Sequence, residues 1–259
     1  MRRLILFVAC LCLAAPVAAQ TAQERAQLDW VQERGRLLFA IDRAAWVSTD
    51  DLRGRLSAAV VGTIRGWIVE RDGRAYIATY YAGEGEARVA VYRSRVERNR
   101  VVSRDVFEEG ERPPLTPLQR RLADARGAIA RMGERPCANA PFNAAIIPPA
   151  TPDGPLDVYA LTPQTEANNY PFGGHFRATL AADGTLSAQR GFMRTCFNSE
   201  VPQGRGRAAP AAMFITHLLD PLPTEIHVFM SIWMGYPVLV GTGERVWAVD
   251  GERIRLMQR

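Results

Sequence analysis

The spacing of apolar residues changes along this chain of 259 residues, and this change constrains the fold more than any other feature. From Thr21 to Trp46, apolar residues recur mostly at three-, four- and seven-residue steps. This spacing predicts a helix whose core face includes Leu28, Leu38 and Trp46. Gly35 is expected to bend or divide it, and the capping residues 48–51 are expected to open a short second helix.

Alternating, β-branched and aromatic segments follow this helical region. They are separated by short turns rich in glycine, asparagine and charged residues, which favours an antiparallel meander of four strands. The predicted strands are residues 63–70, 74–81, 87–96 and 101–107.

The order of helix and strands then occurs a second time. Helical spacing returns from Leu115 to Met132, with Thr116 as the expected cap and Pro117 as the first helical residue. A proline-rich loop is predicted over 136–155. Further predicted strands are 157–162, 174–180, 186–196, 225–233, 237–241, 245–250 and 253–257, whereas 204–207 reads as a loop and 213–219 is ambiguous between strand and short helix.

These patterns predict an α+β fold in which antiparallel β-meanders carry a few helices packed on one face. Two domain arrangements remain open. The chain forms either two similar α+β units, 20–112 and 113–259, or one continuous domain that joins them. No residue-level repeat relates the two segments.

A secretory leader is predicted over residues 1–19. Two arginines precede an apolar run of twelve residues, a proline follows, and small residues end the segment at Ala19. Cleavage there places the start of the mature protein near Gln20. We therefore expect a periplasmic or secreted protein in an oxidising compartment.

Three other interpretations of this segment are weaker. A membrane anchor needs roughly 20 apolar residues, which is more than the run contains. A twin-arginine signal is disfavoured because a single residue precedes Arg2 and Arg3. Lipidation at Cys10 leaves only six apolar residues ahead of the cleavage point, although the short segment before Cys10 resembles a lipoprotein box.

The mature segment retains two cysteines, Cys137 and Cys196, which lie too far apart in sequence for a redox or zinc-binding pair. An even number of cysteines in an exported chain indicates a disulfide. We therefore predict a Cys137–Cys196 bond.

All 32 basic residues are arginine, and the absence of lysine excludes several chemistries. A Walker-type phosphate loop, a Schiff-base enzyme and a Ser-Lys dyad each require a lysine. The formal net charge falls from +5 to +3 when the leader arginines are removed, which does not predict nucleic-acid binding.

The densest basic stretch, Arg88 to Arg104, has acidic residues within and beside it. Residues 83–112 contain seven positive and seven negative charges, so a solvated, salt-bridged sheet face is favoured. A patch that binds an anionic glycan or lipid component of the envelope remains an alternative.

The histidines suggest a candidate site in the last third of the chain. His217, His227, Glu225 and Asp220 lie within eleven residues of one another, and His175 is a further candidate ligand. In the strand predicted there, Glu225 and His227 share one face. Such a group could bind zinc or act as an acid and base, although its spacing matches no standard ligand pattern. No other cofactor is predicted.

A second distinctive segment runs from Tyr170 to His175 and contains two adjacent glycines. It is interpreted either as a turn whose aromatic residues cover the core or as a binding loop in which Tyr170 and Phe172 are exposed near His175.

No standard catalytic signature is present, and no known family is identified from these residues. The sequence therefore favours an exported, soluble, non-catalytic binding or structural module of a bacterial envelope. The alternative is an envelope hydrolase, metal-assisted or acid/base, that uses the His217, Asp220, Glu225 and His227 cluster.

Overall fold

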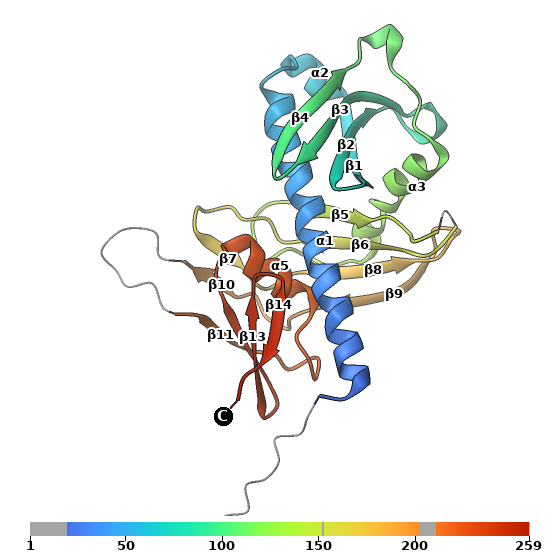
Figure 1. Ribbon diagram of the computed structural model, residues 1–259. Helices are drawn as coiled ribbons and strands as arrows, with labels where there is room; N and C mark the ends of the chain where they lie inside the picture. Colours follow the sequence, from blue (N-terminus) through green and yellow to red (C-terminus); the bar gives the residue numbers. More distant parts are fainter. Residues whose placement is uncertain (1–19, 152, 202–210, 259) are drawn as a thin grey trace, which may run out of the picture.

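A computed structural model describes residues 20–151, 153–201 and 211–258. The predicted leader 1–19 and the predicted loop 204–207 lie outside the described residues. The fold is α+β, with helix α1 (Ala22–Arg53) running along the length of the molecule and the sheets distributed beside it (Figure 1). Among the described helices, none combines the length and the apolar character that a bilayer-spanning segment requires.

Helix α1 is continuous over 32 residues. The Thr21 side chain accepts a hydrogen bond from the Glu24 backbone, and the Glu24 carboxylate accepts one from the Thr21 backbone, so a capping box begins the helix. Two predictions for this region were wrong. Gly35 does not divide the helix, and residues 48–51 lie inside it, whereas the short second helix α2 (Ala58–Thr63) begins after a Ser57 cap.

The first sheet confirms the predicted four-stranded meander. Its strands pair in chain order and antiparallel, and the β3–β4 turn is tight, with positive φ at Arg98 and Asn99. A short 3-10 turn, η1 (Gly85–Ala87), lies between β2 and β3, and a second one, η2 (Glu109–Glu111), follows β4. The strands are β1 (Ile64–Asp72), β2 (Ala75–Ala82), β3 (Val89–Glu97) and β4 (Arg100–Val106).

The predicted helix over 115–132 is present as two pieces, α3 (Pro117–Ala125) and α4 (Ala128–Arg131), which are separated at Arg126 and Gly127. The Thr116 cap and the first-turn position of Pro117 are confirmed, and Gln119 completes a capping box with Thr116. Gly127 accounts for the interruption because glycine weakens a helix interior.

The second sheet is antiparallel, in the order β5-β6-β8-β9. Strand β5 lies inside the segment predicted as a proline-rich loop, so that prediction was too broad. A separate two-stranded ribbon pairs β7 (Asn169–Pro171) with β10 (Asn198–Glu200). The sheet strands are β5 (Asn143–Ile147), β6 (Leu156–Leu161), β8 (Phe176–Leu180) and β9 (Leu186–Gly191).

One strand predicted for the region of the third sheet is a helix in the structure. Residues 225–233 were predicted to be a strand, but Glu225–Met234 is helix α5, which ends at Gly235 with φ 62°. This helix is the crossover between β11 and β12, which pair parallel, as a crossover connection permits. The strands are β11 (Met213–Thr216), β12 (Val238–Thr242), β13 (Arg245–Asp250) and β14 (Arg253–Leu256).

Buried apolar residues of α1 belong to a core cluster that draws on both predicted units. Tyr80 and Tyr92 of the first sheet, Tyr159 of the second and Trp247 of the third all belong to it. A second cluster lies under α3 and also combines residues of the first two sheets. The division at 112/113 nevertheless stays a prediction.

Helix α1 packs closely against α5 at Gly35. A Cβ atom added there would lie 2.5 Å from the Cβ atom of Val228 and 2.7 Å from the carbonyl oxygen of Glu225. The absence of a side chain at Gly35 therefore allows the two helices to pack.

We predict that Gly35→Ala destabilises the protein by about 1–3 kcal/mol, because the added methyl group overpacks the contact with α5. Gly62→Ala is the matched control, since a Cβ atom on this glycine of α2 meets nothing within 4 Å. Alanine favours a helix by about 1 kcal/mol over glycine, so the control should be neutral or stabilising. Urea unfolding measures both variants, and equal stabilities would contradict the packing role of Gly35.

Candidate functional site

The structure brings together three of the predicted histidine-cluster residues. His217 Nε2 donates to Asp220 Oδ2 at 2.8 Å, and the rings of His217 and His227 are perpendicular with centroids 4.7 Å apart. Arg190 donates two further hydrogen bonds to the Asp220 carboxylate, at 2.6 and 3.1 Å. Burial raises the pKa of Asp220, but the hydrogen bonds from His217 and Arg190 outweigh it and hold the pKa below its usual range.

Glu225 has different partners. Its side chain is 3% exposed, and Oε1 accepts hydrogen bonds from Tyr159 Oη at 3.0 Å and from Arg177 at 2.7 Å. The cause is the helical conformation of α5, in which residues two apart project about 200° from each other. Glu225 and His227 therefore do not share a face, contrary to the prediction that rested on a strand.

The zinc hypothesis has no support in the part of the chain that the structure describes. No group of three or more histidine, cysteine or carboxylate side chains there could hold a metal ion. His227 Nδ1 already accepts the Thr224 backbone N–H at 2.9 Å. Burial, followed by the neighbouring His217, lowers the pKa of His227 to about 3, so this imidazole is neutral.

A cavity of about 450 Å³ lies beside this network, and its charged walls are internally paired. Arg177 pairs with Glu225, and Arg190 pairs with Asp220. The Arg177 guanidinium also lies 5.5 Å from the centroid of the Trp30 ring. The carboxylates of the predicted cluster are therefore each paired with an arginine, and the charges of this cavity wall compensate one another.

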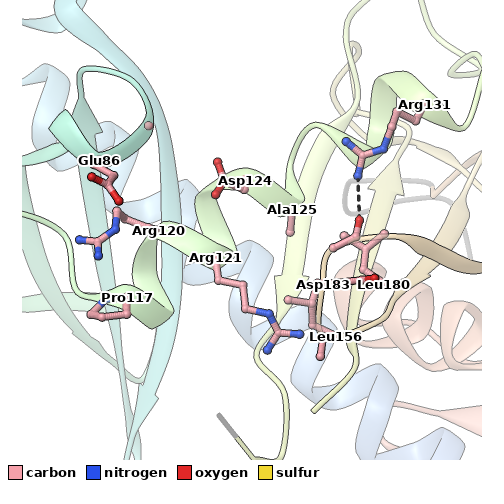
Figure 2. A pocket seen from close by; sticks show the side chains of 13 residues that line it. Glu86, Pro117, Arg120, Arg121, Asp124, Ala125, Arg131, Leu156, Leu180 and Asp183 are labelled. Carbon is pink, nitrogen blue, oxygen red and sulfur yellow. Dashed lines mark hydrogen bonds between the residues drawn. The ribbon is translucent and has the colours of Figure 1, made fainter. Parts of the chain in front are cut away.

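A cavity of about 510 Å³ lies between the first and second sheets at α3 (Figure 2). Arg120 and Arg121 project from α3 in different directions in this view. Arg120 donates to the Leu115 carbonyl at 2.6 Å, and Arg121 to the Gly154 carbonyl at 2.6 Å. These arginines hold backbone segments in place around the cavity.

Arginines of the basic stretch 88–104 form ion pairs, but of their acidic partners only Glu97 belongs to the balanced region 83–112. Arg88 pairs with Asp124, and Arg104 pairs with Asp51. Arg95 pairs with Asp72 and also with Glu97. These pairs favour the solvated, salt-bridged interpretation, and an anionic envelope partner stays an untested prediction.

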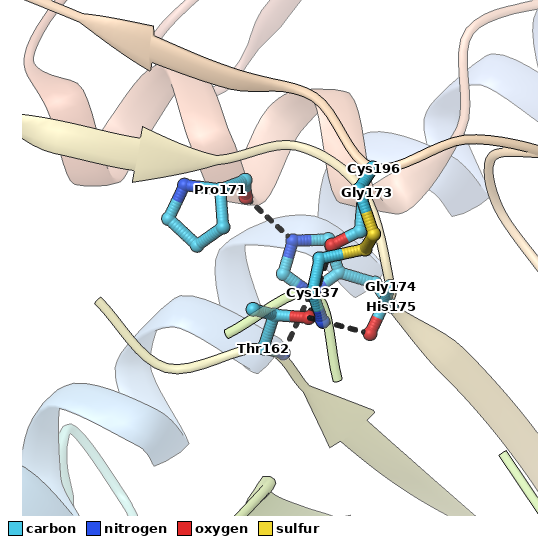
Figure 3. The surroundings of a disulfide bond; sticks show 7 residues. All are labelled: Cys137, Thr162, Pro171, Gly173, Gly174, His175 and Cys196. Atoms are coloured by element: carbon cyan, nitrogen blue, oxygen red, sulfur yellow. Dashed lines mark hydrogen bonds between the residues drawn. A yellow bond between two sulfur atoms is a disulfide. The ribbon is translucent and has the colours of Figure 1, made fainter. Parts of the chain in front are cut away.

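The predicted Cys137–Cys196 disulfide is confirmed (Figure 3). The two adjacent glycines of the segment from Tyr170 to His175 lie against its cysteines. A Cβ atom at Gly174, where φ is 71°, would lie 2.7 Å from Cys137 Sγ. His175 lies beside the bond and is buried. Its Nε2 donates to the Pro171 carbonyl at 2.8 Å, and its Nδ1 accepts the Thr162 backbone N–H at 3.2 Å.

The exposed binding loop expected from Tyr170 to His175 is not what the structure shows. Phe172 and His175 are each 1% exposed, so neither residue is accessible to a ligand, and the burial lowers the pKa of His175 to about 4. Tyr170 is 9% exposed and packs edge-on against Trp233 of α5 at 5.4 Å. Tyr170 does line a cavity, which is formed mainly by α1.

This cavity and an adjoining one form what we call the α1 cleft, with volumes of about 480 and 240 Å³. The two cavities share Asp42, Trp46 and Asn143. One helical face contributes the α1 wall, because its members recur at three- and four-residue steps. The α1 wall contains Phe39, Asp42, Arg43, Ala45, Trp46, Thr49, Asp50 and Arg53, and the opposite wall contains Trp67, Asn99, Asn143, Gln164, Tyr170 and Trp233.

Trp46 corrects another prediction. It was assigned to the core face of the helix, yet its side chain is 56% exposed, and Ala44, Ala45 and Ser48 are the buried residues of that turn. The Arg43 guanidinium lies 4.5 Å from the centroid of the Trp46 ring. Arg43 therefore covers part of the indole, and the exposed remainder is a contact surface for a ligand.

Asp42 is the most perturbed acid of the cleft. Burial raises its pKa to about 6, and the charge of Arg43 opposes this effect. The carboxylate makes no hydrogen bond or ion pair with any other described residue. A desolvated carboxylate in a cleft, without a protein partner, is a candidate ligand-binding group.

Asp42 was not predicted as a site residue, because its polar neighbours on α1 are typical of a solvated helix face. A signal was present in the spacing of Phe39, Asp42, Trp46 and Asp50, which places aromatic and acidic residues along one stripe. The residues of the opposite wall come from distant segments, and their convergence depends on the tertiary fold.

In comparisons with protein-family models, curated proteins and solved structures, no match to this chain was found.

We predict that the oxidised protein, denatured without reductant, has no free thiol among residues 20–259, and that Cys137→Ser/Cys196→Ser lowers stability by about 2–4 kcal/mol. The reason is that the bond closes a loop with a sequence separation of 59. Thiol titration and urea unfolding measure the two effects. Two free thiols in the untreated protein would contradict the bond.

We predict that Asp42→Asn stabilises the protein by about 1–2 kcal/mol at pH 7.5. The folded-state pKa of about 6 exceeds the ordinary value of 3.8, so ionisation of Asp42 opposes folding. The wild type should therefore lose stability relative to the variant as the pH rises from about 4 to 6. Below pH 4 both side chains are neutral, and the difference should vanish.

Urea unfolding across this pH range tests the Asp42 prediction. Asp29→Asn, at an exposed position of the same helix, controls for the loss of a negative charge and should change stability by about 0.5 kcal/mol or less. A difference between Asp42→Asn and wild type that is independent of pH would show that Asp42 is not desolvated.

Proposed function

We propose that this protein is an exported, non-catalytic binding module of a bacterial envelope, and that the α1 cleft is its ligand site. The observation that carries the proposal is the unpartnered Asp42 carboxylate beside the exposed Trp46 ring. The volume of the larger cavity, about 480 Å³, lies within the range of small-molecule sites.

The cavities of about 510 and 450 Å³ offer a ligand fewer unpaired charged groups. Their arginines already bind carboxylates or backbone carbonyls, as Arg190 binds Asp220 and Arg120 binds the Leu115 carbonyl. A ligand there competes with existing hydrogen bonds. In the α1 cleft, a ligand donor gains the Asp42 carboxylate without displacing a protein partner.

The alternative function, a hydrolase that uses His217, Asp220, Glu225 and His227, has less support. Asp220 is held by His217 and Arg190, and Glu225 by Tyr159 and Arg177. His217 and His227 do not line the adjacent cavity. A general acid or base must reach its substrate, and these imidazoles have no such access.

Export is part of the proposal. The leader pattern of residues 1–19 supports it, and the Cys137–Cys196 bond is compatible with an oxidising compartment. Mass spectrometry of the mature chain tests it, with Gln20 as the expected first residue.

A ligand-observed NMR experiment tests the binding function. The mature protein is mixed with maltose, glucuronate, choline and trialanine, and saturation transfer to each compound is recorded. We expect transfer to at least one compound, because the cleft provides an exposed indole and an unpartnered carboxylate. Trp46→Ala should abolish this transfer.

Trp30→Ala is the matched control, since Trp30 is an exposed tryptophan of the same helix outside the α1 cleft. It should leave the transfer unchanged. The proposal fails when no compound shows transfer that depends on Trp46.

A further inference from the structure

The charges of the α1 cleft balance within its own wall. Asp42 and Asp50 provide two carboxylates, and Arg43 and Arg53 provide two guanidinium groups. Complementarity of charge therefore favours a ligand without net charge over an anion or a cation. Nucleotides and sugar acids are disfavoured on this basis.

The hydrogen-bonding groups of the cleft suit a ligand with many hydroxyls. Asn99, Asn143 and Gln164 each present an amide donor and an amide acceptor, and Asp42 adds acceptor oxygens. A hydroxyl group both donates and accepts, so neighbouring hydroxyls match an amide side chain in both directions. A purely apolar ligand would leave these groups desolvated and unpaired.

The aromatic residues supply the complementary apolar contact. Trp46 and Trp233 line the larger cavity together with Tyr170, and Trp67 lines the smaller one. A pyranose ring has a face of C–H groups that packs on an aromatic ring while its hydroxyls point to the side. A quaternary ammonium ligand also uses aromatic rings, but the Arg43 guanidinium, 4.5 Å from the centroid of the Trp46 ring, would repel a second cation there and would not repel a neutral sugar.

The extent of the cleft favours a chain of sugars over a single ring. Its α1 wall runs from Phe39 to Arg53, which corresponds to about 20 Å along the helix axis. Trp46 and Asn143 lie at the junction and line both cavities. A linear ligand can therefore occupy both cavities and contact Trp46 at its middle.

From these observations we infer that the α1 cleft binds a neutral oligosaccharide, with Trp46 as the stacking platform and with Asp42 and Asn143 as hydrogen-bonding partners of its hydroxyls. This inference rests on the proposed binding function and names its ligand class.

Isothermal titration calorimetry on the mature protein tests the inference. The probes are cellohexaose, maltohexaose and chitohexaose, with choline, glucuronate and trialanine as the charged and peptide comparisons. At least one hexasaccharide should bind more tightly than all three comparison compounds. Trp46→Ala should weaken that binding at least tenfold, as expected for an aromatic residue at the centre of a site.

Two further variants complete the design. Asn143→Ala should also weaken the binding, so that a second residue of the cleft tests the site independently of the tryptophan substitution. Trp30→Ala should change the dissociation constant by less than about twofold, since it lies outside the cleft. Circular dichroism and urea unfolding of each variant confirm that it is folded.

The outcomes separate the inference from the proposed function. Hexasaccharide binding that Trp46→Ala does not weaken overturns the inference. Binding of choline, glucuronate or trialanine alone, with dependence on Trp46, overturns the inference and retains the binding function. The absence of any Trp46-dependent binding overturns both.

Discussion

The packing of α1 is the interaction on which the rest of the structure depends. Its 32 residues extend over about 48 Å, and a helix of this length has to be stabilised by tertiary contacts along much of that distance. Small residues on its buried stripe allow those contacts to be close. Gly35 meets α5, and further along the helix the Ala45 carbonyl accepts a hydrogen bond from the Tyr80 hydroxyl at 2.7 Å.

The same helix explains where the cleft lies. One stripe of α1 is buried against the sheets, and the neighbouring stripe contains Asp42 and Trp46. The opposite wall is assembled from Asn99 of the first sheet's turn, Asn143 of β5 and Trp233 of α5. The cleft therefore exists only when the first sheet and the segment 113–259 are both packed on α1.

The sequence predicted the elements whose pattern is local and missed those that depend on distant contacts. The first meander, the Thr116 cap and the disulfide follow from turn residues, capping chemistry and cysteine count. Helix α5 was mistaken for a strand because it is rich in β-branched and aromatic residues and eight of its ten residues are buried, so no amphipathic period is visible. The stop signal at Gly235 was present but was read as a turn between strands.

The candidate site was predictable only in part, for the same reason. The sequence placed His217, Asp220 and His227 near one another, and the structure does so, yet each of them already makes a hydrogen bond within the protein. Trp46 was assigned to the core because helical spacing alone does not distinguish a buried stripe from its neighbour. The unpartnered state of Asp42 depends on which side chains surround it, and no local pattern contains that information.

Native-state hydrogen exchange tests most directly whether α1 and the sheets on it form one cooperative unit. The account predicts that the most protected amides of α1, β2, β6 and β12 exchange with one shared opening free energy and one shared dependence on denaturant. Opening of β1–β4 together with the C-terminal half of α1, while β5–β14 stay protected, would contradict it.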